Sequence, residues 1–357
     1  MSASLGPLLP LFERERRAGR ALVLGVLVHT SGSTYQKAGA LILITQDGDY
    51  AGLLSGGCLE GDLKEHAAGV LTDGQARLVR YELRGPEELL WGLGLGCEGG
   101  MRILLRRVGP EDGWQPLERL RGALEAREAL AVAFASESTR ADVPLGTVVL
   151  PGESGGARLQ AALEDAAGRG LSAWHVAEAR DVSWFLLCLA LPPRLLLLGA
   201  GPDAAPVAEF AMRLNWKVTL VDHRPAYADP AHFPGAEQVL RLDAAELGTA
   251  LGLEQFRAAV IMSHHLPTDL AYLRALARSD VPYVGLLGPP QRRDRLLGEL
   301  GTEAATRLRR RLHAPVGLAL GGRTPEAIAL AIVAELQAFL HAHEATAPGL
   351  TRLAGAQ

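Results

Sequence analysis

The sequence predicts an α/β protein of two domains: a mixed α/β domain at the N-terminal end and a Rossmann-like, doubly wound parallel sheet at the C-terminal end. Its 357 residues exceed the size at which a single hydrophobic core usually stops growing. Strand-like apolar runs dominate residues 21–108, whereas strands and helices alternate after residue 192. The double proline Pro192-Pro193 marks the boundary between the two patterns.

The first predicted domain covers residues 1–110. Strands are expected in ALVLGVLVHT, ALILIT and MRILLRRV, and the pair Asp47-Gly48 is typical of a hairpin turn between ALILIT and YAGLLSGG. In LEGDLKEHAAGV, residues 59–70, apolar residues recur at helical spacing. We therefore expect a helix directly after the glycine turn that precedes it.

The middle segment, residues 111–191, has the weakest pattern, and we expect it to pack with the first domain. PLERLRGALEAREALAVAFA, residues 116–135, is typical of a helix, and strands with Gly- and Ser-rich turns follow. Cys188 lies inside the apolar run WFLLCLAL and is expected in the core. No site residue is assigned to this segment.

The second predicted domain covers residues 192–345 and leaves a tail at 346–357. LLLLGAGPDAAPVAEFAMRLNWKVTLVD is typical of a buried strand, a glycine turn, a helix and a second strand that ends in an acid. The strand of AAVIMSHH, a helix near 268–278 and the strand PYVGLLG continue the alternation. Thr324 can cap a final helix in which Pro325 takes the first position.

Composition narrows the function classes. The formal net charge of −4 argues against a protein that binds nucleic acid through clustered positive charge. No apolar run approaches the roughly 20 residues of a membrane span, and the N-terminus lacks the pattern of a secretory signal. Three cysteines without a CxxC pair fit neither a disulfide framework nor a structural zinc site. We expect a cytoplasmic protein with no membrane or nucleic-acid partner.

The glycine turn after residue 198 is a candidate cofactor site. Gly199 permits a tight turn, Gly201 lets the backbone approach a pyrophosphate, and Asp222 stands where an acid would hold a ribose. NAD(P) or another nucleotide is therefore a possible ligand. Pro202 removes an N–H donor and Asp203 places a negative charge near the phosphates, so an inherited fold with a weak or empty site is the alternative.

Two further segments follow strands of the second domain. His264 and His265, in SHHLPTD, are expected at the carboxyl edge of the sheet, where with Asp269 they could bind a metal or a phosphate. Neighbouring residues on a strand end point in opposite directions, so one histidine should face the crevice. Either could serve as proton donor in an NAD(P)-dependent oxidoreductase, and a solvated loop is the alternative. QRRDR, residues 291–295, could contact phosphate or lie on the surface.

Three glycine-rich turns occur in the first domain: HTSGSTYQKAGA, LLSGGCLEGD and GLGLGCEGG. Such turns expose backbone N–H groups that can bind an anion. Two of them carry a cysteine, Cys58 and Cys97, and a thiolate can ligate a soft metal or accept sulfur. A phosphate-bearing cofactor with sulfur ligands would suit them. Small buried apolar cysteines, or persulfide carriers of a sulfurtransferase, are the other interpretations.

These segments together resemble the XdhC/CoxI family of accessory proteins for xanthine dehydrogenase and carbon monoxide dehydrogenase. GSTYQKAGA resembles that family's GSTYRRPGA, LLSGGCLEGD its SGGCVEG, GLGLGCEGG its GLGCGG and LLLLGAGPDAAPVA its GAGHVAxPVA. VTLVDHRPAYA, VIMSHHLPTDL, YVGLLGPPQRR and GLALGGRTPEAIALAIVAE complete the resemblance in the same order.

The resemblance implies a cofactor chaperone, more than a catalyst, that works as a homodimer. It would bind molybdenum cofactor (molybdopterin), protect it while sulfur is installed with a cysteine desulfurase, and pass it to an apo xanthine dehydrogenase-type enzyme. The cofactor contacts that it implies are Cys58, Cys97, Gly56, Gly57, Glu60 and Gly96. Lys37 is the one cation in its turn, since Gln36 replaces the family's arginine, and Pro202 replaces the family's histidine.

Overall fold

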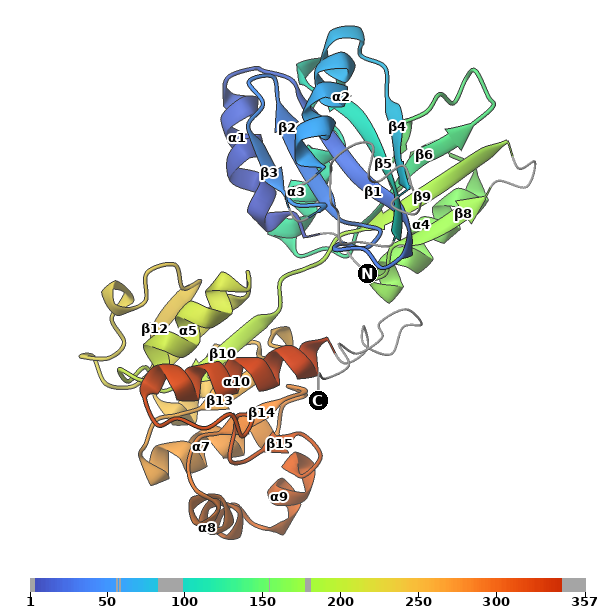
Figure 1. The fold of residues 1–357 in the computed structure, drawn as a ribbon. Coiled ribbons are helices and arrows are strands. Elements are labelled where there is room, and N and C mark those ends of the chain that lie inside the picture. Colours follow the sequence, from blue (N-terminus) through green and yellow to red (C-terminus); the bar gives the residue numbers. More distant parts are fainter. Residues whose placement is uncertain are drawn as a thin grey trace. The chain divides into compact units, whose positions relative to one another are not determined.

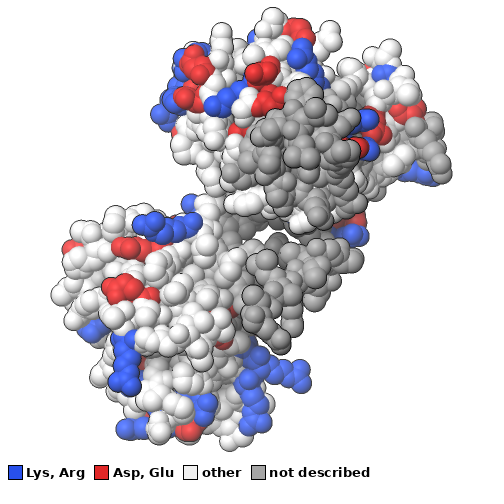
Figure 2. Space-filling view, in the orientation of Figure 1, with Lys and Arg blue, Asp and Glu red and all other residues white. Residues whose placement is uncertain are grey.

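The computed structural model describes residues 4–55, 57, 59–82, 99–153, 155–176 and 181–341. It divides into two compact units, residues 1–191 (unit 1) and 192–357 (unit 2). Figure 1 shows both units as layers of helices and sheets. None of the described helices combines the length and the hydropathy that crossing a lipid bilayer would need. On the face of unit 1 drawn in Figure 2, basic and acidic side chains are intermixed.

Unit 1 contains two antiparallel sheets, one with the strand order β3-β2-β1-β5-β4 and one with the order β7-β6-β9-β8. The strands are β1 (Leu22–Gly32), β2 (Leu41–Thr45), β3 (Tyr50–Gly52), β4 (Arg77–Glu82), β5 (Gly99–Val108), β6 (Ala131–Ser138), β7 (Val148–Val149), β8 (Ala173–Val176) and β9 (Val182–Cys188). The helices are α1 (Leu9–Arg17), α2 (Glu60–Asp73), α3 (Leu117–Ala126) and α4 (Ala157–Arg169).

The layers of unit 1 follow from strands that are buried on both faces. On β1, Leu24 faces a core shared with α1, α3 and the second sheet, whereas Val23 faces α2. The shared core joins Phe12 of α1 with Phe134 of β6, so the middle segment and the N-terminal strands bury one another. The far face of the second sheet packs on α4. Cys188 is fully buried in this unit, as its apolar surroundings predict.

The helix predicted over residues 116–135 is wrong in its second half. Helix α3 ends at Ala126, where Arg127 takes a left-handed conformation with φ of 59°. The run AVAFA belongs to strand β6, in which Ala131 and Val132 face different cores. A strand buried on both faces gives an unbroken apolar run, which periodicity alone does not separate from a buried helix.

Unit 2 is a Rossmann-like domain, which confirms the predicted fold class. Its parallel sheet has the order β12-β11-β10-β13-β14-β15, which is the 3-2-1-4-5-6 order of a dinucleotide-binding fold. The strands are β10 (Arg194–Leu198), β11 (Lys217–Asp222), β12 (Gln238–Arg241), β13 (Ala258–Ile261), β14 (Val284–Leu286) and β15 (Leu312–His313). The helices are α5 (Ala204–Arg213), α6 (Leu247–Ala250), α7 (Leu266–Ala277), α8 (Pro290–Leu300), α9 (Thr302–Leu308) and α10 (Pro325–Leu340).

Helices cover both faces of the unit 2 sheet (Figure 1). Helices α5 and α10 pack on one face, and α6 to α9 pack on the other. The side chain of Thr324 caps α10 by accepting a hydrogen bond from the N–H of Ala327, and Pro325 occupies the first turn. This winding places the turns after β10, β11 and β13 at one edge of the sheet, where α/β proteins bind their ligands.

Candidate functional site

The turn before α2 is held by one buried carboxylate. Glu60 is 2% exposed, and its oxygens accept hydrogen bonds from the N–H groups of Leu54 (3.2 Å) and Ser55 (3.0 Å) and from the Ser55 hydroxyl (2.6 Å). The Ser55 oxygen in turn accepts hydrogen bonds from the N–H groups of Gly57 and Leu59. These four backbone donors are therefore engaged within the turn and do not point at an external anion.

The same hydrogen bonds set the charge of Glu60. Burial acts to raise the pKa of this carboxyl group, but the bonds from the Ser55 side chain and the neighbouring backbone outweigh burial and lower the pKa below its ordinary range. Glu60 is thus a carboxylate at neutral pH, fixed two positions after Cys58 in the sequence. Cys58, Cys97, Gly56 and Gly96 lie outside the described residues.

Gly57 and Lys37 belong to different loops of unit 1. Gly57 is exposed and has a φ of 106°, a left-handed conformation that favours glycine. The Lys37 ammonium lies 3.4 Å from the Thr34 hydroxyl oxygen, in the loop that follows β1. That loop runs close to the start of β5, because a Cβ on Gly99 would come within 2.5 Å of the Ser33 carbonyl oxygen.

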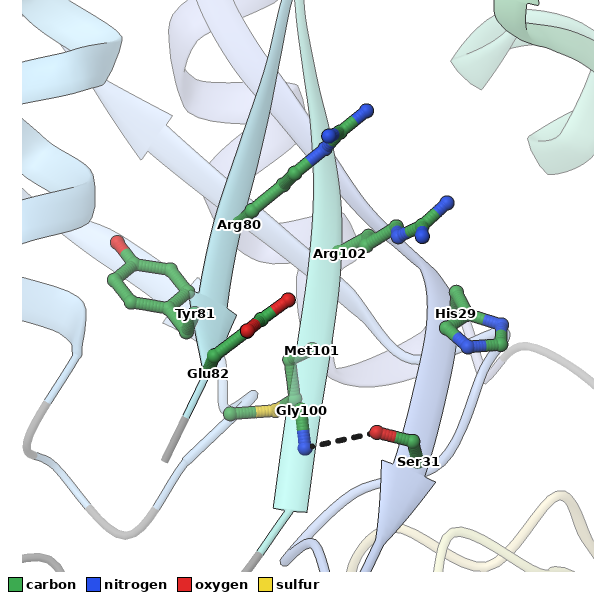
Figure 3. A pocket seen from close by; sticks show the side chains of 8 residues that line it. All are labelled: His29, Ser31, Arg80, Tyr81, Glu82, Gly100, Met101 and Arg102. Carbon is green, nitrogen blue, oxygen red and sulfur yellow. Dashed lines mark hydrogen bonds between the residues drawn. The ribbon is translucent and has the colours of Figure 1, made fainter. Parts of the chain in front are cut away.

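A cavity of about 240 Å³ lies against the first sheet of unit 1. Figure 3 shows its wall, which comes from three neighbouring strands, β1, β5 and β4. We call it the arginine pocket and define it by its side chains and one glycine: His29, Ser31, Arg80, Glu82, Gly100 and Arg102.

The register of the strands explains the pocket. Arg102 lies opposite Arg80 on one side and His29 on the other, so the three form one row across the sheet. Two residues further along, Gly100 lies between Ser31 and Glu82 on the same face. Gly100 has no side chain, which leaves a hollow in the second row, and its N–H donates to the Ser31 hydroxyl at 3.1 Å (Figure 3).

In unit 2, the turn after β10 depends on Gly199. This residue has a φ of 115°, and a Cβ on it would come within 2.6 Å of the Met262 carbonyl carbon and oxygen. Glycine is therefore required for the close approach of the turn to β13. This is the tight turn that the GAG sequence predicts.

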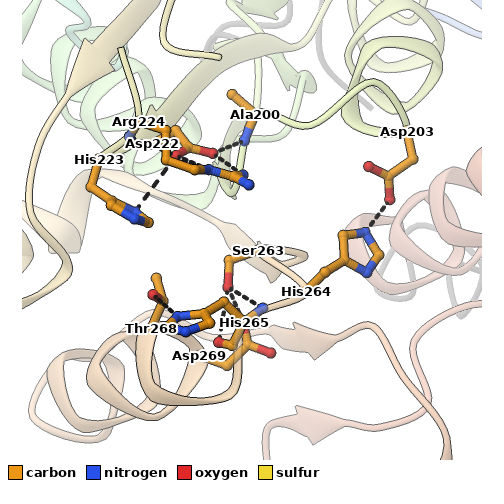
Figure 4. Close-up of polar contacts among 10 residues, drawn as sticks. All are labelled: Ala200, Asp203, Asp222, His223, Arg224, Ser263, His264, His265, Thr268 and Asp269. Carbon is orange, nitrogen blue, oxygen red and sulfur yellow. Dashed lines mark hydrogen bonds and ion pairs between the residues drawn. The ribbon is translucent and has the colours of Figure 1, made fainter. Parts of the chain in front are cut away.

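Asp222 ties the same turn to strand β11. It is 1% exposed, and its oxygens accept hydrogen bonds from the Ala200 N–H (2.9 Å) and from the guanidinium of Arg224 (2.9 and 2.7 Å), as Figure 4 shows. Burial acts to raise the pKa of Asp222, but the bonds from Arg224 and Ala200 outweigh it and lower the pKa. Oδ2 thus bonds both the turn and Arg224, and Oδ1 bonds the backbone and side chain of Arg224. Both oxygens that a ribose would need already have partners within the chain.

The glycine turn is also covered by a hydrogen bond between Asp203 and His264. The Asp203 carboxylate lies 2.7 Å from His264 Nε2, and its other oxygen would be 2.9 Å from a Cβ on Gly201 (Figure 4). His264 has a φ of 58°, an uncommon conformation for a residue other than glycine, and this conformation turns its ring toward the turn. A carboxylate therefore occupies the amino end of α5, where a pyrophosphate would approach a dinucleotide-binding fold.

His265 and Asp269 point elsewhere. His265 Nδ1 lies 2.8 Å from the Thr268 hydroxyl, at the first turn of α7. Asp269 is 1% exposed and accepts hydrogen bonds from Ser263 and from the guanidinium of Arg292 (3.1 and 2.7 Å). Within the described ranges, no group of three or more His, Cys, Asp or Glu side chains could hold a metal ion.

Sequence reasoning missed the arginine pocket. Arg80 and Arg102 occur in strand-like runs, RLVRYE and MRILLRRV, where scattered arginines are typical of an ordinary solvent-exposed face. The signal that singles them out is the pairing of β4 with β5, which places the two cations directly opposite each other. Strand register is not readable from one strand's sequence.

Comparison with known proteins identifies both units. The family model described as "XdhC and CoxI family" matches residues 15–82, and the model described as "XdhC Rossmann domain" matches residues 195–336. A Bacillus subtilis protein, named as a probable subunit of xanthine dehydrogenase, is 32% identical over 317 residues, which cover 88% of this chain and 92% of that protein. An Escherichia coli protein called "molybdenum cofactor insertion chaperone PaoD" is 25% identical over 333 residues, covering 92% of this chain and 86% of the relative.

A solved structure agrees with these matches. A Bacillus halodurans protein, described as a xanthine dehydrogenase, superposes with a TM-score of 0.78 and 28% sequence identity, covering 96% of this chain and 98% of that one. The similarity therefore extends over both units and the order of their elements. On these matches, the chain belongs to the XdhC and CoxI family.

Proposed function

We propose that this protein binds molybdenum cofactor and delivers it to an apo-enzyme of the xanthine dehydrogenase type. The observation that carries the proposal is the match, over 92% of the chain, to a relative called a molybdenum cofactor insertion chaperone. The Bacillus subtilis relative, whose name refers to xanthine dehydrogenase, supports the choice of client enzyme. The chain would act in the cytoplasm as a homodimer, and the cofactor is its cargo.

We place the cargo on the glycine turns of unit 1. Glu60 bonds the N–H groups of Leu54 and Ser55, and the Ser55 hydroxyl bonds the N–H of Leu59, so the described residues on either side of this turn are tied together. We propose that Cys58 and Cys97 contact the sulfur-rich metal end of the cargo, since thiolates are suited to soft metals. Gly56, Gly57 and Gly96 would let the backbone approach, and Lys37 would add a cation.

Sulfur installation is the second part of the proposal. A cysteine desulfurase would supply sulfur to the bound cargo while the accessory protein shields it from solvent. Either Cys58 or Cys97 is then also a candidate to carry sulfur as a persulfide, which it would take over from the persulfide of the desulfurase. A sulfurtransferase role would require that persulfide to form on the chain in the absence of cofactor, which mass spectrometry of the desulfurase-treated protein measures.

An NAD(P)-dependent oxidoreductase has less support. The oxygens of Asp222 are engaged by Arg224 and Ala200, and Asp203 lies over the glycine turn that would meet the pyrophosphate. A nucleotide would have to displace the Asp203–His264 pair to reach Gly199 and Gly201. We therefore do not propose hydride transfer, and unit 2 remains a second candidate surface for a phosphate of the cargo.

The test is an anaerobic titration of the purified chain with molybdenum cofactor, followed by gel filtration and measurement of bound molybdenum. We expect near-stoichiometric retention by the wild type and weaker retention by Cys58→Ser and by Cys97→Ser. Cys188→Ala is the matched control, because Cys188 is buried in the core of unit 1. Absence of retention by the wild type refutes the proposed function, and equal losses in all three variants refute the assignment of the thiols.

A further inference from the structure

We propose that the arginine pocket binds the phosphate group of the cargo, with Arg80 and Arg102 as its anion-binding side chains. The described residues that line the pocket all belong to strands β1, β4 and β5 of unit 1. The identity of the ligand as a phosphorylated pterin rests on the proposed function, whereas the affinity for a phosphate monoester follows from the pocket itself.

The first argument is the placement of two like charges. Arg80 and Arg102 are directly opposite each other on the antiparallel pair β4 and β5, and their side chains lie on the same face (Figure 3). Like charges in this relation destabilise a sheet. An anion bound between them would remove that repulsion, so the arrangement is one that a ligand stabilises.

The second argument is the counterion that the chain itself supplies. Glu137 of β6 places one oxygen 3.0 Å from Arg102 Nη1 and 3.9 Å from Arg80 Nη2. A guanidinium carries five N–H donors in a planar fork, and a single shared carboxylate oxygen uses few of them. A phosphate offers three oxygens and can meet both forks, so it would compete successfully with Glu137.

The hollow beside the arginines sets the shape of the ligand. Gly100 leaves room in the row that it forms with Ser31 and Glu82 across the sheet. A Cβ on Gly100 would come within 2.8 Å of the Ser31 hydroxyl oxygen. Glu82 closes the far side of the hollow and presents a carboxylate to it. A ligand with phosphate at one end and N–H donors at the other fits this charge pattern, whereas a free polyanion would be repelled by Glu82.

An aromatic side chain stands beside the pocket. Trp174 of β8 lies edge-on to His29, with 6.3 Å between the ring centroids, and it is 41% exposed. A partly exposed aromatic ring near a polar cavity is suited to contact with a flat heteroaromatic ring. The pocket thus combines a cation pair with an acceptor, and Trp174 lies against its lining residue His29. These are groups that would recognise a phosphorylated pterin.

The test compares a pterin monophosphate with the same pterin lacking the phosphate, by fluorescence titration of the full chain. We expect the wild type to bind the phosphorylated probe at least about tenfold more tightly. Arg102→Gln and Arg80→Gln should each remove most of that preference without changing the affinity for the unphosphorylated probe. Glu137→Gln should strengthen binding of the phosphorylated probe, an increase that a misfolded variant would not produce.

Arg119→Gln is the matched control, since Arg119 is a partly exposed arginine of unit 1 that pairs with Glu128 at 3.2 Å. Equal affinity of the wild type for the two probes overturns the inference, as does an equal effect of Arg102→Gln and Arg119→Gln. If the wild type retains molybdenum cofactor but shows no preference for the phosphorylated probe, only this inference fails. If it shows the preference through its arginines but retains no cofactor, the proposed function fails and the phosphate site stands.

Discussion

Replacing Glu60 should open the turn that carries Cys58 without unfolding unit 1. Glu60→Ala removes the acceptor of three hydrogen bonds, two from the backbone and one from the Ser55 hydroxyl. A hydrogen bond to a charged group contributes about 1.5–3 kcal/mol, so the three set an upper bound of roughly 4.5–9 kcal/mol. The turn can relax, and the cost of burying the carboxylate is also lost, so we expect about 3–5 kcal/mol.

Glu60→Gln gives a graded second variant. Its amide oxygen can still accept from Leu54 and Ser55, but its NH₂ group would face the Ser55 hydroxyl oxygen. That oxygen already accepts from the N–H groups of Gly57 and Leu59, so a further donor has no good acceptor there. We expect a cost of about 1–2 kcal/mol.

Amide hydrogen exchange of the full chain, read by mass spectrometry on peptides covering residues 53–63, measures this opening. At about 1.4 kcal/mol per tenfold, exchange should be at least about a hundredfold faster in Glu60→Ala and about tenfold faster in Glu60→Gln. Glu65→Gln is the matched control, because Glu65 is exposed on the same helix. Exchange in Glu60→Ala as slow as in Glu65→Gln would show that the carboxylate does not hold the turn.

The pH dependence has a definite sign. The folded pKa of Glu60 lies below its ordinary value, so its contribution to the turn is complete above the ordinary glutamate pKa. It is lost as the pH falls through the lowered folded value. Exchange of the turn, corrected for the intrinsic pH effect, should therefore stay constant near neutrality and accelerate only in that acid range.

Three further predictions concern stability and ligand binding. Gly199→Ala should destabilise unit 2 by about 2–4 kcal/mol, because the new Cβ would meet the Met262 backbone. Denaturant unfolding, followed by hydrogen exchange in unit 2, measures this loss. An unchanged unfolding midpoint contradicts the prediction. Asp222→Asn should destabilise the same unit by about 2–3 kcal/mol, a figure discounted for the partial exposure of Arg224. Neither this variant nor the wild type should show saturable binding in titrations with NAD⁺ and NADPH. Saturable binding by the wild type refutes this interpretation of the turn. Burial raises the pKa of three tyrosines well above the ordinary value. In an alkaline titration followed by ultraviolet absorbance, three of the six tyrosines should therefore stay protonated until the chain unfolds. Ionisation of all six tyrosines together near the ordinary pKa would contradict this prediction. The three tyrosines are Tyr81, Tyr272 and Tyr283. Their folded pKa values exceed the unfolded ones, so their contribution to stability is complete below the ordinary tyrosine pKa and falls as the pH rises above it.

The sequence by itself determined the elements whose signals are local. The glycine turn after β10, the cap of α10 at Thr324 and the hairpin at Asp47-Gly48 depend on a few neighbouring residues, and the structure contains all three. Alternation of strands and helices was enough to predict the Rossmann-like sheet, because a parallel strand needs a crossover connection. The ordered set of motifs was enough to predict the family.

The tertiary structure decided what depends on pairing between distant segments. Residues 131–135 are a strand because both their faces are covered, which an apolar run does not reveal. Asp222 has the sequence position of a ribose ligand, yet the fold brings Arg224 and Ala200 to its oxygens. The arginine pocket exists because the register of β4 and β5 aligns Arg80 with Arg102 and brings Glu137 beside them. Side chains on different strands become neighbours only when the sheet forms, so their combined charge is a property of the fold.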